Sequence, residues 1–276
     1  FNLTDPRRSE TYAVPTSRGS NPDIRPENSD TVYFGLLYEP SWLSGVSFEV
    51  NRYRTVQDGA IQVVSAQSMV NNEDQFADRI TRAPQSPDDI AAGIPGRITA
   101  LNQTFINFGK IVNESVDFTL NYKVRTANRG NITLQTFATR VLEARRELAP
   151  GVPAVDDLGD TFAPPKWRYS IYGFWDYGPW NASAYLTWLS RFSTNQAGNT
   201  FTATYPIPSQ TSLDLRGGYT FRDGLWNGAL QGLRLSLGMG NVFGDDPAFS
   251  DTVYGFNGAV HSPLGRTYEL SMQLPF

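Results

Sequence analysis

The residues that could do chemistry are few, and most lie in segments rich in turn-forming residues. His261 is the only histidine, so no Ser-His-Asp arrangement is supported and a metal site with two histidines is impossible. Asp245, Asp246 and Asp251 could bind calcium through carboxylate oxygens, but turn chemistry beside Pro247 explains the same residues. The sequence therefore predicts no enzyme, no metal and no cofactor.

The long polar segments offer side chains suited to ligand binding, because binding residues concentrate on loops held by a rigid scaffold. Segment 193–209 places Phe201 and Tyr205 among Asn, Gln and Thr, a mixture able to stack on and hydrogen-bond to a sugar or a chelate. Surface loops often share that composition. We take Phe201, Tyr205 and His261 as ligand-binding candidates, although a solvated loop position is the simpler interpretation of His261.

Two further stretches have both a functional and an ordinary interpretation. Arg145 and Arg146 could hold an anionic ligand or lipopolysaccharide, or they could be charged residues at the base of a loop. The stretch GMGNVFG (238–244) resembles a dinucleotide-binding loop only superficially, because its glycine spacing differs and no helix follows. Small residues in a strand explain that stretch better.

Composition excludes several classes of protein. The 276 residues carry 23 basic and 27 acidic side chains, so there is no basic surplus of the kind that binds nucleic acid. There are no cysteines, which excludes a disulfide scaffold and thiolate metal sites. No stretch approaches the roughly 20 apolar residues of a membrane-spanning helix. A β protein enriched in aromatic residues remains.

Alternation of apolar and polar residues is the dominant pattern of the chain. In VDFTLNYKV (116–124), Val, Phe, Leu, Tyr and Val share one face of a strand, while Asp, Thr, Asn and Lys share the other. Similar segments recur between clusters of turn-forming residues. The expected strands are 32–39, 46–64, 104–125, 131–144, 167–176, 180–189, 212–221, 233–240 and the closing stretch that ends at Phe276.

The two faces of these strands favour a membrane barrel over a soluble sandwich. Their polar positions hold Ser, Thr, Asn, Gln, Arg and Asp at a density suited to a wet interior, whereas the outer face of a soluble sheet carries Lys and Glu freely. Trp167, Trp175, Trp180 and Trp188 lie close to expected turns, as in the aromatic girdles of a lipid-facing barrel. The alternative is that aromatic residues simply favour strands.

Connector lengths give the strands an orientation. The connectors at 40–45, 126–130, 177–179 and 222–232 are short, and those at 65–103, 145–165, 193–209 and 244–265 are long. Short turns at one rim and long loops at the other are the layout of bacterial outer-membrane barrels. We therefore expect an all-β, antiparallel transmembrane barrel segment of about nine up-and-down strands, with short periplasmic turns and long extracellular loops.

Strand parity indicates that this segment belongs to a larger barrel. Bacterial barrels have even strand numbers, and nine strands that finish at the short-turn rim must start at the long-loop rim. Residues 1–30 are then expected to be an extracellular loop segment, and residues 31–276 the C-terminal strands. The chain starts at Phe1 without a leader, so a signal peptide is either removed or upstream.

Three stretches resemble motifs of TonB-dependent outer-membrane receptors. NPDIRPENSDT (21–31) is similar to the segment that precedes a barrel strand in that family, and NVFGDDPAF (241–249) to the motif that follows the penultimate strand. The closing GRTYELSMQLPF (265–276) resembles the family's last strand with its terminal Phe. Gly244 stands where the family usually has Asp, and Pro275 is unusual because proline cannot donate a ladder hydrogen bond.

The resemblance implies the last nine strands of a 22-stranded barrel that encloses a plug. The plug and TonB box are expected to lie outside this chain, in upstream sequence or a partner chain, so coupling to the TonB-ExbB-ExbD complex would pass through them. The implied function is import of a scarce ligand, such as a siderophore, cobalamin, oligosaccharide or peptide, across the bacterial outer membrane.

The closing strand is expected to pair with the first barrel strand and to be recognised by the barrel assembly machinery. Its apolar residues would face outer-membrane lipid, because they alternate with polar ones; they are Tyr268, Leu270, Met272, Leu274 and Phe276. The alternative function is a passive porin or structural barrel completed by a partner chain. An outer-membrane enzyme is disfavoured by the single histidine, and a soluble β-sandwich is the remaining alternative.

Overall fold

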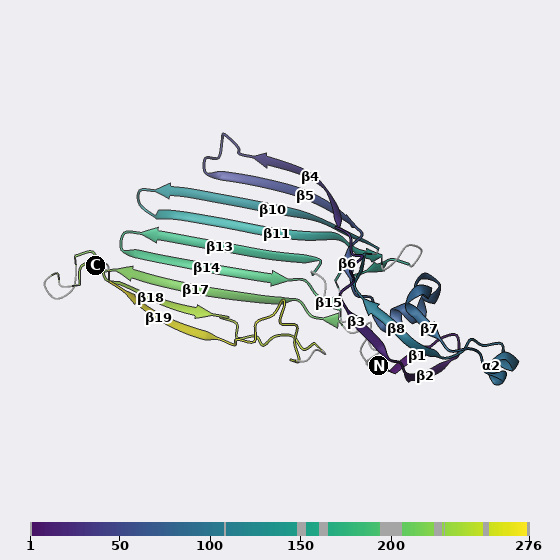
Figure 1. The fold of residues 1–276 in the computed structure, drawn as a ribbon. Helices are drawn as coiled ribbons and strands as arrows, with labels where there is room; N and C mark the ends of the chain where they lie inside the picture. Colours follow the sequence, from purple (N-terminus) through teal and green to yellow (C-terminus); the bar gives the residue numbers. More distant parts are fainter. Residues whose placement is uncertain are drawn as a thin grey trace.

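A meander of antiparallel strands forms one broad sheet in the computed structural model of the chain (Figure 1). The structure describes residues 2–107, 109–147, 153–159, 165–193, 206–223, 228, 230–250 and 254–274. Within these residues, nine strands follow one another in the same order in the chain and in the sheet. They are β4 (Asn28–Tyr38), β5 (Val46–Asp58), β10 (Lys110–Thr126), β11 (Gly130–Glu147), β13 (Trp167–Tyr177), β14 (Trp180–Leu189), β17 (Gln210–Thr220), β18 (Arg234–Gly240) and β19 (Thr267–Gln273).

The predicted strand number and the alternation of short and long connectors are confirmed. Two strand ends differ most from the prediction, by six residues each, and glycine explains both. The strand expected over 46–64 ends at Asp58, and the strand expected over 104–125 begins at Lys110. Gly59 and Gly109 lie beside these ends with φ of 67° each, a left-handed conformation that interrupts extended backbone.

Each strand presents one apolar and one polar face. Leu237 lies opposite Leu270 in the sheet register, and their exposed fractions are 63% and 76%. Within the described residues, no second layer covers these two side chains, as a soluble sandwich would require. We call this side the apolar face; its members include Val116, Phe118, Leu120, Tyr122, Ile132, Leu134, Ile171, Leu186, Leu215, Leu235, Leu237, Met239, Tyr268, Leu270 and Met272.

The opposite side, the polar face, is tied together by hydrogen bonds between neighbouring strands. Thr139 Oγ1 donates to Asp117 Oδ1 at 2.8 Å, and Asn131 Nδ2 donates to Asp176 Oδ2 at 2.8 Å. The Tyr33 hydroxyl donates to Asn51 Oδ1 at 2.7 Å. Such bonds suit a surface in contact with water, where unpaired donors and acceptors remain solvated.

The sheet is open at both sides. Among the described residues, β4 has a ladder partner only in β5, and β19 only in β18. Figure 1 shows these two strands at opposite margins of the sheet. Each margin therefore presents a row of backbone groups that another strand could pair with. No helix of the described residues is long and apolar enough to cross a membrane.

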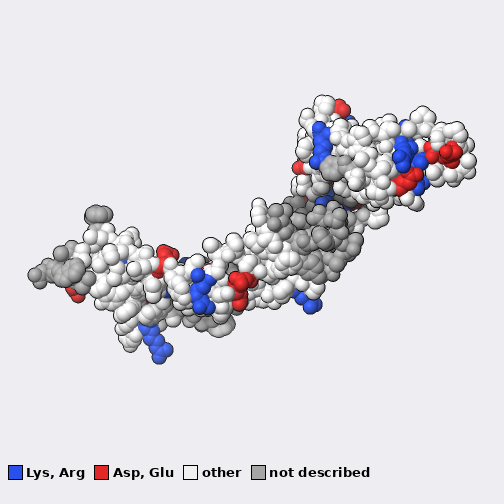
Figure 2. All heavy atoms as spheres, turned by 90° about the horizontal axis from the view of Figure 1, so that it is seen from below, with Lys and Arg blue, Asp and Glu red and all other residues white. Residues whose placement is uncertain are grey.

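A small folded unit lies at the end of the sheet where the long connectors emerge (Figures 1 and 2). We call it the head unit, and it is made of residues 2–19 and 61–107. Its elements are β1 (Asn2–Asp5), β2 (Glu10–Ala13), β3 (Thr16–Gly19), β6 (Ile61–Gln62), α1 (Ala66–Asn71), the 3-10 helices η1 (Glu73–Gln75) and η2 (Ala77–Arg79), β7 (Ile80–Arg82), α2 (Pro87–Ala92), β8 (Ile98–Thr104) and β9 (Ile106–Asn107). Short pieces outside it are β12 (Val155–Asp156), beside β11, and β15 (Phe192–Ser193), paired with β16 (Pro206–Ile207).

The head unit has its own hydrophobic core. Met69 and Leu101 are almost fully buried, together with Leu3 and Val14 from the first hairpin. Part of the segment expected as a loop over residues 1–30 is therefore folded, because its apolar residues pack against the long connector between β5 and β10. The segment after it is also fixed: Asn21 Nδ2 donates to the Phe105 carbonyl at 3.0 Å.

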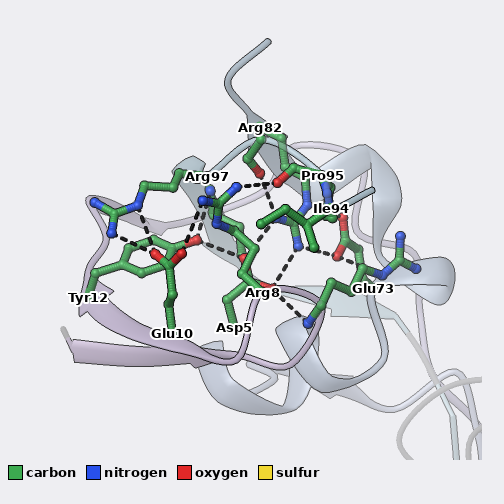
Figure 3. Close-up of polar contacts among 12 residues, drawn as sticks. Asp5, Arg8, Glu10, Tyr12, Glu73, Arg82, Ile94, Pro95 and Arg97 are labelled. Carbon is green, nitrogen blue, oxygen red and sulfur yellow. Dashed lines mark hydrogen bonds and ion pairs between the residues drawn. The ribbon is translucent and has the colours of Figure 1, made fainter. Parts of the chain in front are cut away.

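Ion pairs between distant segments hold the first hairpin against the rest of the head unit (Figure 3). Arg82 donates to Asp5 Oδ2 at 2.8 Å and to Glu73 Oε2 at 2.6 Å. Arg8 donates to Asp89 Oδ1 at 2.7 Å. The side chain of Asp5 is only 1% exposed, so its charge depends on these partners.

The same contacts shift the pKa values of the carboxyl groups. Burial alone would raise the pKa of Asp5, but hydrogen bonds from Arg82 and Tyr12 outweigh burial and lower it. Hydrogen bonding with Ser86, which α2 uses as its N-cap, lowers the pKa of Asp89 to about 2, with a further contribution from Arg8. Both groups are thus ionised at neutral pH.

We predict that the apolar face tolerates a charge much less well than the polar face. Leu270→Lys places an ammonium group in hydrocarbon and should cost about 2 to 4 kcal/mol, whereas Ser271→Lys, one residue along β19, points to the other side. The amount of folded, heat-modifiable protein in the outer membrane should fall for Leu270→Lys alone. Equal loss for both variants would contradict the assignment of the faces.

We predict that Arg82→Met opens the head unit. Removing one partner of a buried ion pair costs about 3 to 5 kcal/mol, because the other charge remains buried, and here Asp5 would be left in that state. The measurement is the rate of limited proteolysis within residues 65–103. Arg97→Met is the control, since the Arg97 side chain is 59% exposed. Adding Asp5→Asn to Arg82→Met should restore part of the resistance.

The head unit should also lose stability in acid. Because the pKa of Asp5 is lower in the folded protein than in the unfolded chain, its contribution is complete above about pH 4, the ordinary carboxyl pKa, and is lost as pH falls through the folded value. Proteolytic resistance should therefore be constant from pH 7 to about pH 5 and decline only below about pH 4. A decline between pH 7 and pH 5 would show that other groups control this unit.

Candidate ligand-binding site

A polar pocket lies on the polar face where β14, β17, β18 and β19 meet the long connectors. Its volume is about 310 Å³. The strands contribute short polar side chains, and the connector after β18 closes the opposite side. Its lining includes Thr187, Gln210, Ser212, Asp214, Asn241, Asp245, His261 and Thr267.

Asn241 shapes one wall of the pocket. Its φ of 47° is left-handed, a conformation that asparagine adopts more readily than most residues. Its backbone N–H donates to Asp214 Oδ1 at 2.8 Å, and its side chain Nδ2 donates to the Asp245 carbonyl at 2.9 Å. These bonds turn the chain away from β18 over the pocket, which gives a physical reason for an asparagine at the start of NVFGDDPAF.

Glycines leave the space that the pocket occupies. The polar face of β18 carries Ser236, Gly238 and Gly240. A Cβ at Gly240 would lie 2.6 Å from Thr267 Oγ1, so a larger residue would displace that side chain. The interpretation of GMGNVFG as small residues in a strand therefore agrees with the structure.

His261 contributes a buried, neutral ring to the pocket lining. Its exposed fraction is 5%, and its ring stacks on Phe192 with centroids 5.7 Å apart. Burial lowers the pKa of His261, so the imidazole is uncharged at neutral pH. Both ring nitrogens lack a hydrogen-bond partner in the described part of the protein. The expectation of a solvated loop position is wrong, because the connector folds back onto Phe192.

Deeper along the polar face, the pocket continues into a second hollow of about 300 Å³. Arg216 donates to Glu269 Oε2 at 2.5 Å across this hollow, and both side chains are about half exposed. Asp214 and Thr267 line both spaces. Together the two hollows form a water-accessible track of hydroxyl, carboxylate and guanidinium groups, suited to a polar ligand rich in hydrogen-bonding groups.

The other sequence-derived candidates are distributed as follows. Phe201 and Tyr205 lie outside the described residues. Tyr268, Leu270 and Met272 share the apolar face of β19, opposite Met239, Leu237 and Leu235. Leu274 follows the end of β19, and Phe276 lies outside the described residues.

Arg145 and Arg146 do not form one site, because adjacent strand residues face opposite sides. Arg145 pairs with Glu143 at 3.1 Å on the side of the apolar face, and Arg146 pairs with Asp157 at 3.1 Å on the other side. No group of side chains suited to a metal ion occurs among the described residues, and Asp251 lies outside them.

Sequence reasoning missed the strand residues of the pocket. Thr187, Ser212, Asp214 and Thr267 all occupy polar positions close to the long-connector ends of expected strands. The alternation pattern could have identified them as inward-facing residues of a barrel mouth. It could not have identified the connector that closes over them.

Comparisons with known proteins agree with this architecture. The family profile "TonB dependent receptor-like, beta-barrel" matches residues 4–242. No curated protein sequence matches the chain. Similar solved structures include a double mutant of the ferric enterobactin receptor of Pseudomonas aeruginosa, with a TM-score of 0.60 and 15% identity over 96% of this chain and 33% of that one.

Two further solved structures resemble the chain to a similar degree. The siderophore receptor PirA from Acinetobacter baumannii has a TM-score of 0.58 and 14% identity, over 94% of this chain and 33% of that one. The pyoverdine outer membrane receptor of Pseudomonas aeruginosa has a TM-score of 0.59 and 11% identity, over 93% of this chain and 31% of that one. The chain thus spans about a third of the length of these structures.

The family profile covers most of the chain, and the open sheet corresponds to part of the barrel in the similar structures. The location that these comparisons indicate is the bacterial outer membrane. On these grounds the chain belongs to the TonB-dependent receptor family, of which it forms part of the β-barrel.

Proposed function

We propose that this chain is part of the wall of a receptor that imports a scarce ligand across the outer membrane with energy supplied through TonB. The observation that carries the proposal is the polar pocket at the long-connector rim, on the face that would line the barrel. Its hydroxyl and carboxylate groups and the neutral ring of His261 could bind a siderophore or another polar ligand. The similar structures include siderophore receptors, which makes siderophores the first ligands to test.

In this proposal the long connectors and the head unit are extracellular and the short turns are periplasmic. Residues 1–30 then belong to an external region, as the sequence predicts. The nine strands of the sheet, which the sequence places within residues 31–276, form the barrel wall. A ligand would meet the head unit and connectors first, then the pocket, and then the track past Arg216 and Glu269. The step is transport without chemistry on the ligand.

The proposal requires partners for both open margins of the sheet. Within hydrocarbon, every backbone N–H and C=O needs a partner in protein, so β4 and β19 would each pair with a further strand of the barrel. A plug that fills the barrel, the TonB-ExbB-ExbD complex acting on it and the barrel assembly machinery complete the set of partners.

We predict that uptake depends on this protein and on TonB. The measurement is uptake of ⁵⁵Fe supplied as ferric enterobactin or ferric pyoverdine, by iron-limited cells with and without the native gene. Energised uptake should disappear when the gene or tonB is deleted, whereas a passive porin would conduct without TonB. If neither siderophore enters, labelled cobalamin and oligosaccharides are tested in the same strains. Uptake that persists without TonB would contradict the proposal in favour of the porin.

We predict that His261→Phe weakens ligand capture without unfolding the pocket. Phenylalanine keeps the ring stacked on Phe192 but removes both ring nitrogens. Loss of one hydrogen bond, worth about 1 kcal/mol, should lower affinity for the transported ligand by roughly 5- to 10-fold. Tyr268→Phe is the control, because it also loses one polar group but lies on the apolar face. An unchanged affinity in His261→Phe would remove His261 from the binding site.

A further inference from the structure

Three arginines lie on the apolar side of the sheet, at the end of the hydrocarbon-facing band next to the long connectors. Val116 of β10 lies opposite Arg52 of β5 on one side and Arg140 of β11 on the other. The two arginine Cα atoms are therefore separated by two strand spacings, about 10 Å. Arg54 lies one step farther along β5, on the same side.

A belt of stacked aromatic rings marks this end of the band. Tyr169 stacks with Trp188, with ring centroids 4.8 Å apart, and its ring is tilted by 34° to that of Trp167 at 5.5 Å. Phe118 continues the belt, stacked at 6.4 Å from Trp167. The guanidinium of Arg140 lies over the Trp167 ring at 5.3 Å from its centroid. Aromatic belts lie at the level of lipid headgroups, so these arginines lie where hydrocarbon gives way to headgroups.

The three arginines keep much of their own hydrogen-bonding capacity, although carboxylates lie near them. Glu114, 9% exposed, accepts from Arg52 at 2.5 and 2.8 Å and lies 3.3 Å from Arg54. The side chains of Arg52 and Arg54 remain 59% and 44% exposed. Arg140 is exposed, and within the described residues no carboxylate pairs with it.

Acidic residues on this side lie farther from the aromatic belt. Glu143 is opposite Glu114 in the register; it pairs with Arg145 at 3.1 Å and lies 3.8 Å from Arg54. Asp58 and Glu147 are both opposite Lys110, at the far end of the strands. The charged residues nearest to the aromatic belt are therefore arginines. Glu114 forms ion pairs with two of them, Arg52 and Arg54.

We propose that Arg52, Arg54 and Arg140 bind a phosphate of a phosphorylated glycolipid in the membrane leaflet at the long-connector rim. Guanidinium groups recognise phosphate oxygens through paired N–H donors. A lipid is the expected source of the phosphate because the arginines border the apolar face, where acyl chains would contact Phe118 and its neighbours. The site faces away from the ligand pocket and does not depend on transport.

The test uses the full-length native protein in detergent and measures its binding of bis-phosphorylated lipid A by native mass spectrometry. Arg52→Gln combined with Arg140→Gln should lower the affinity for lipid A by about tenfold or more, since charge-assisted hydrogen bonds are lost. Dephosphorylated lipid A should bind the unaltered protein as weakly as lipid A binds the double variant. Millimolar inorganic phosphate should not displace the lipid.

Arg168→Gln is the matched control, because Arg168 adjoins Trp167 in β13 but lies on the polar face, opposite Thr139. This substitution removes one positive charge, as Arg140→Gln does, at nearly the same level along the strands. It should leave lipid A binding unchanged. Arg140→Gln alone provides a second variant that leaves the Glu114 ion pairs intact, and heat-modifiable mobility verifies folding of each protein. Equal binding by wild type and double variant, equal binding of the dephosphorylated lipid, or an equal effect of Arg168→Gln would each overturn the proposal. Siderophore uptake is measured separately, so failure here leaves the proposed transport function standing.

Discussion

A strand in hydrocarbon must place its backbone N–H and C=O groups in hydrogen bonds within protein, because an unsatisfied group there costs several kcal/mol. That requirement accounts for the long continuous ladders of the sheet. Among the described residues, helices occur instead in the head unit, and irregular backbone occurs there and in the connectors. Gly59 and Gly109 lie where two strands give way to irregular backbone, because their left-handed φ interrupts the regular ladder. The open margins of β4 and β19 follow from the same requirement: they call for further strands.

The sheet and the head unit are stabilised in different ways. In the part of the chain that the structure describes, side chains such as Leu237 and Leu270 on the apolar face remain exposed, as a lipid-facing surface requires. The polar face is held by hydrogen bonds between strands. The head unit instead buries Met69 and Leu101 in a core of its own, as a soluble domain does. Its buried charges, such as Asp5, are compensated by arginines from distant segments. Loss of one such arginine should therefore affect the head unit and leave the sheet intact.

The sequence was sufficient for the sheet because strand alternation is local, and every strand of the meander pairs with its neighbours in the chain. The head unit was missed because residues far apart in the sequence form its core. In the sequence Leu3 and Val14 are isolated apolar residues in a polar segment, and only the structure shows that they pack with Met69. The burial of His261 was missed for a similar reason, since it depends on contact with Phe192, about seventy residues earlier. Polar positions of the pocket could be inferred from alternation, whereas its closure by the Asn241 turn required the structure.

Strand register also determines what a charged residue can do. Arg145 and Arg146 look like one basic cluster in the sequence, yet they pair with Glu143 and Asp157 on opposite sides of the sheet. Arg140 and Arg168 likewise lie in adjacent strands near Trp167 but belong to the apolar face and the polar face respectively. Displacement by a single residue thus moves a side chain from the apolar face to the polar face. The proposed ligand pocket and the proposed lipid site can therefore lie on opposite faces of one sheet, because its strands alternate their side chains between the two faces.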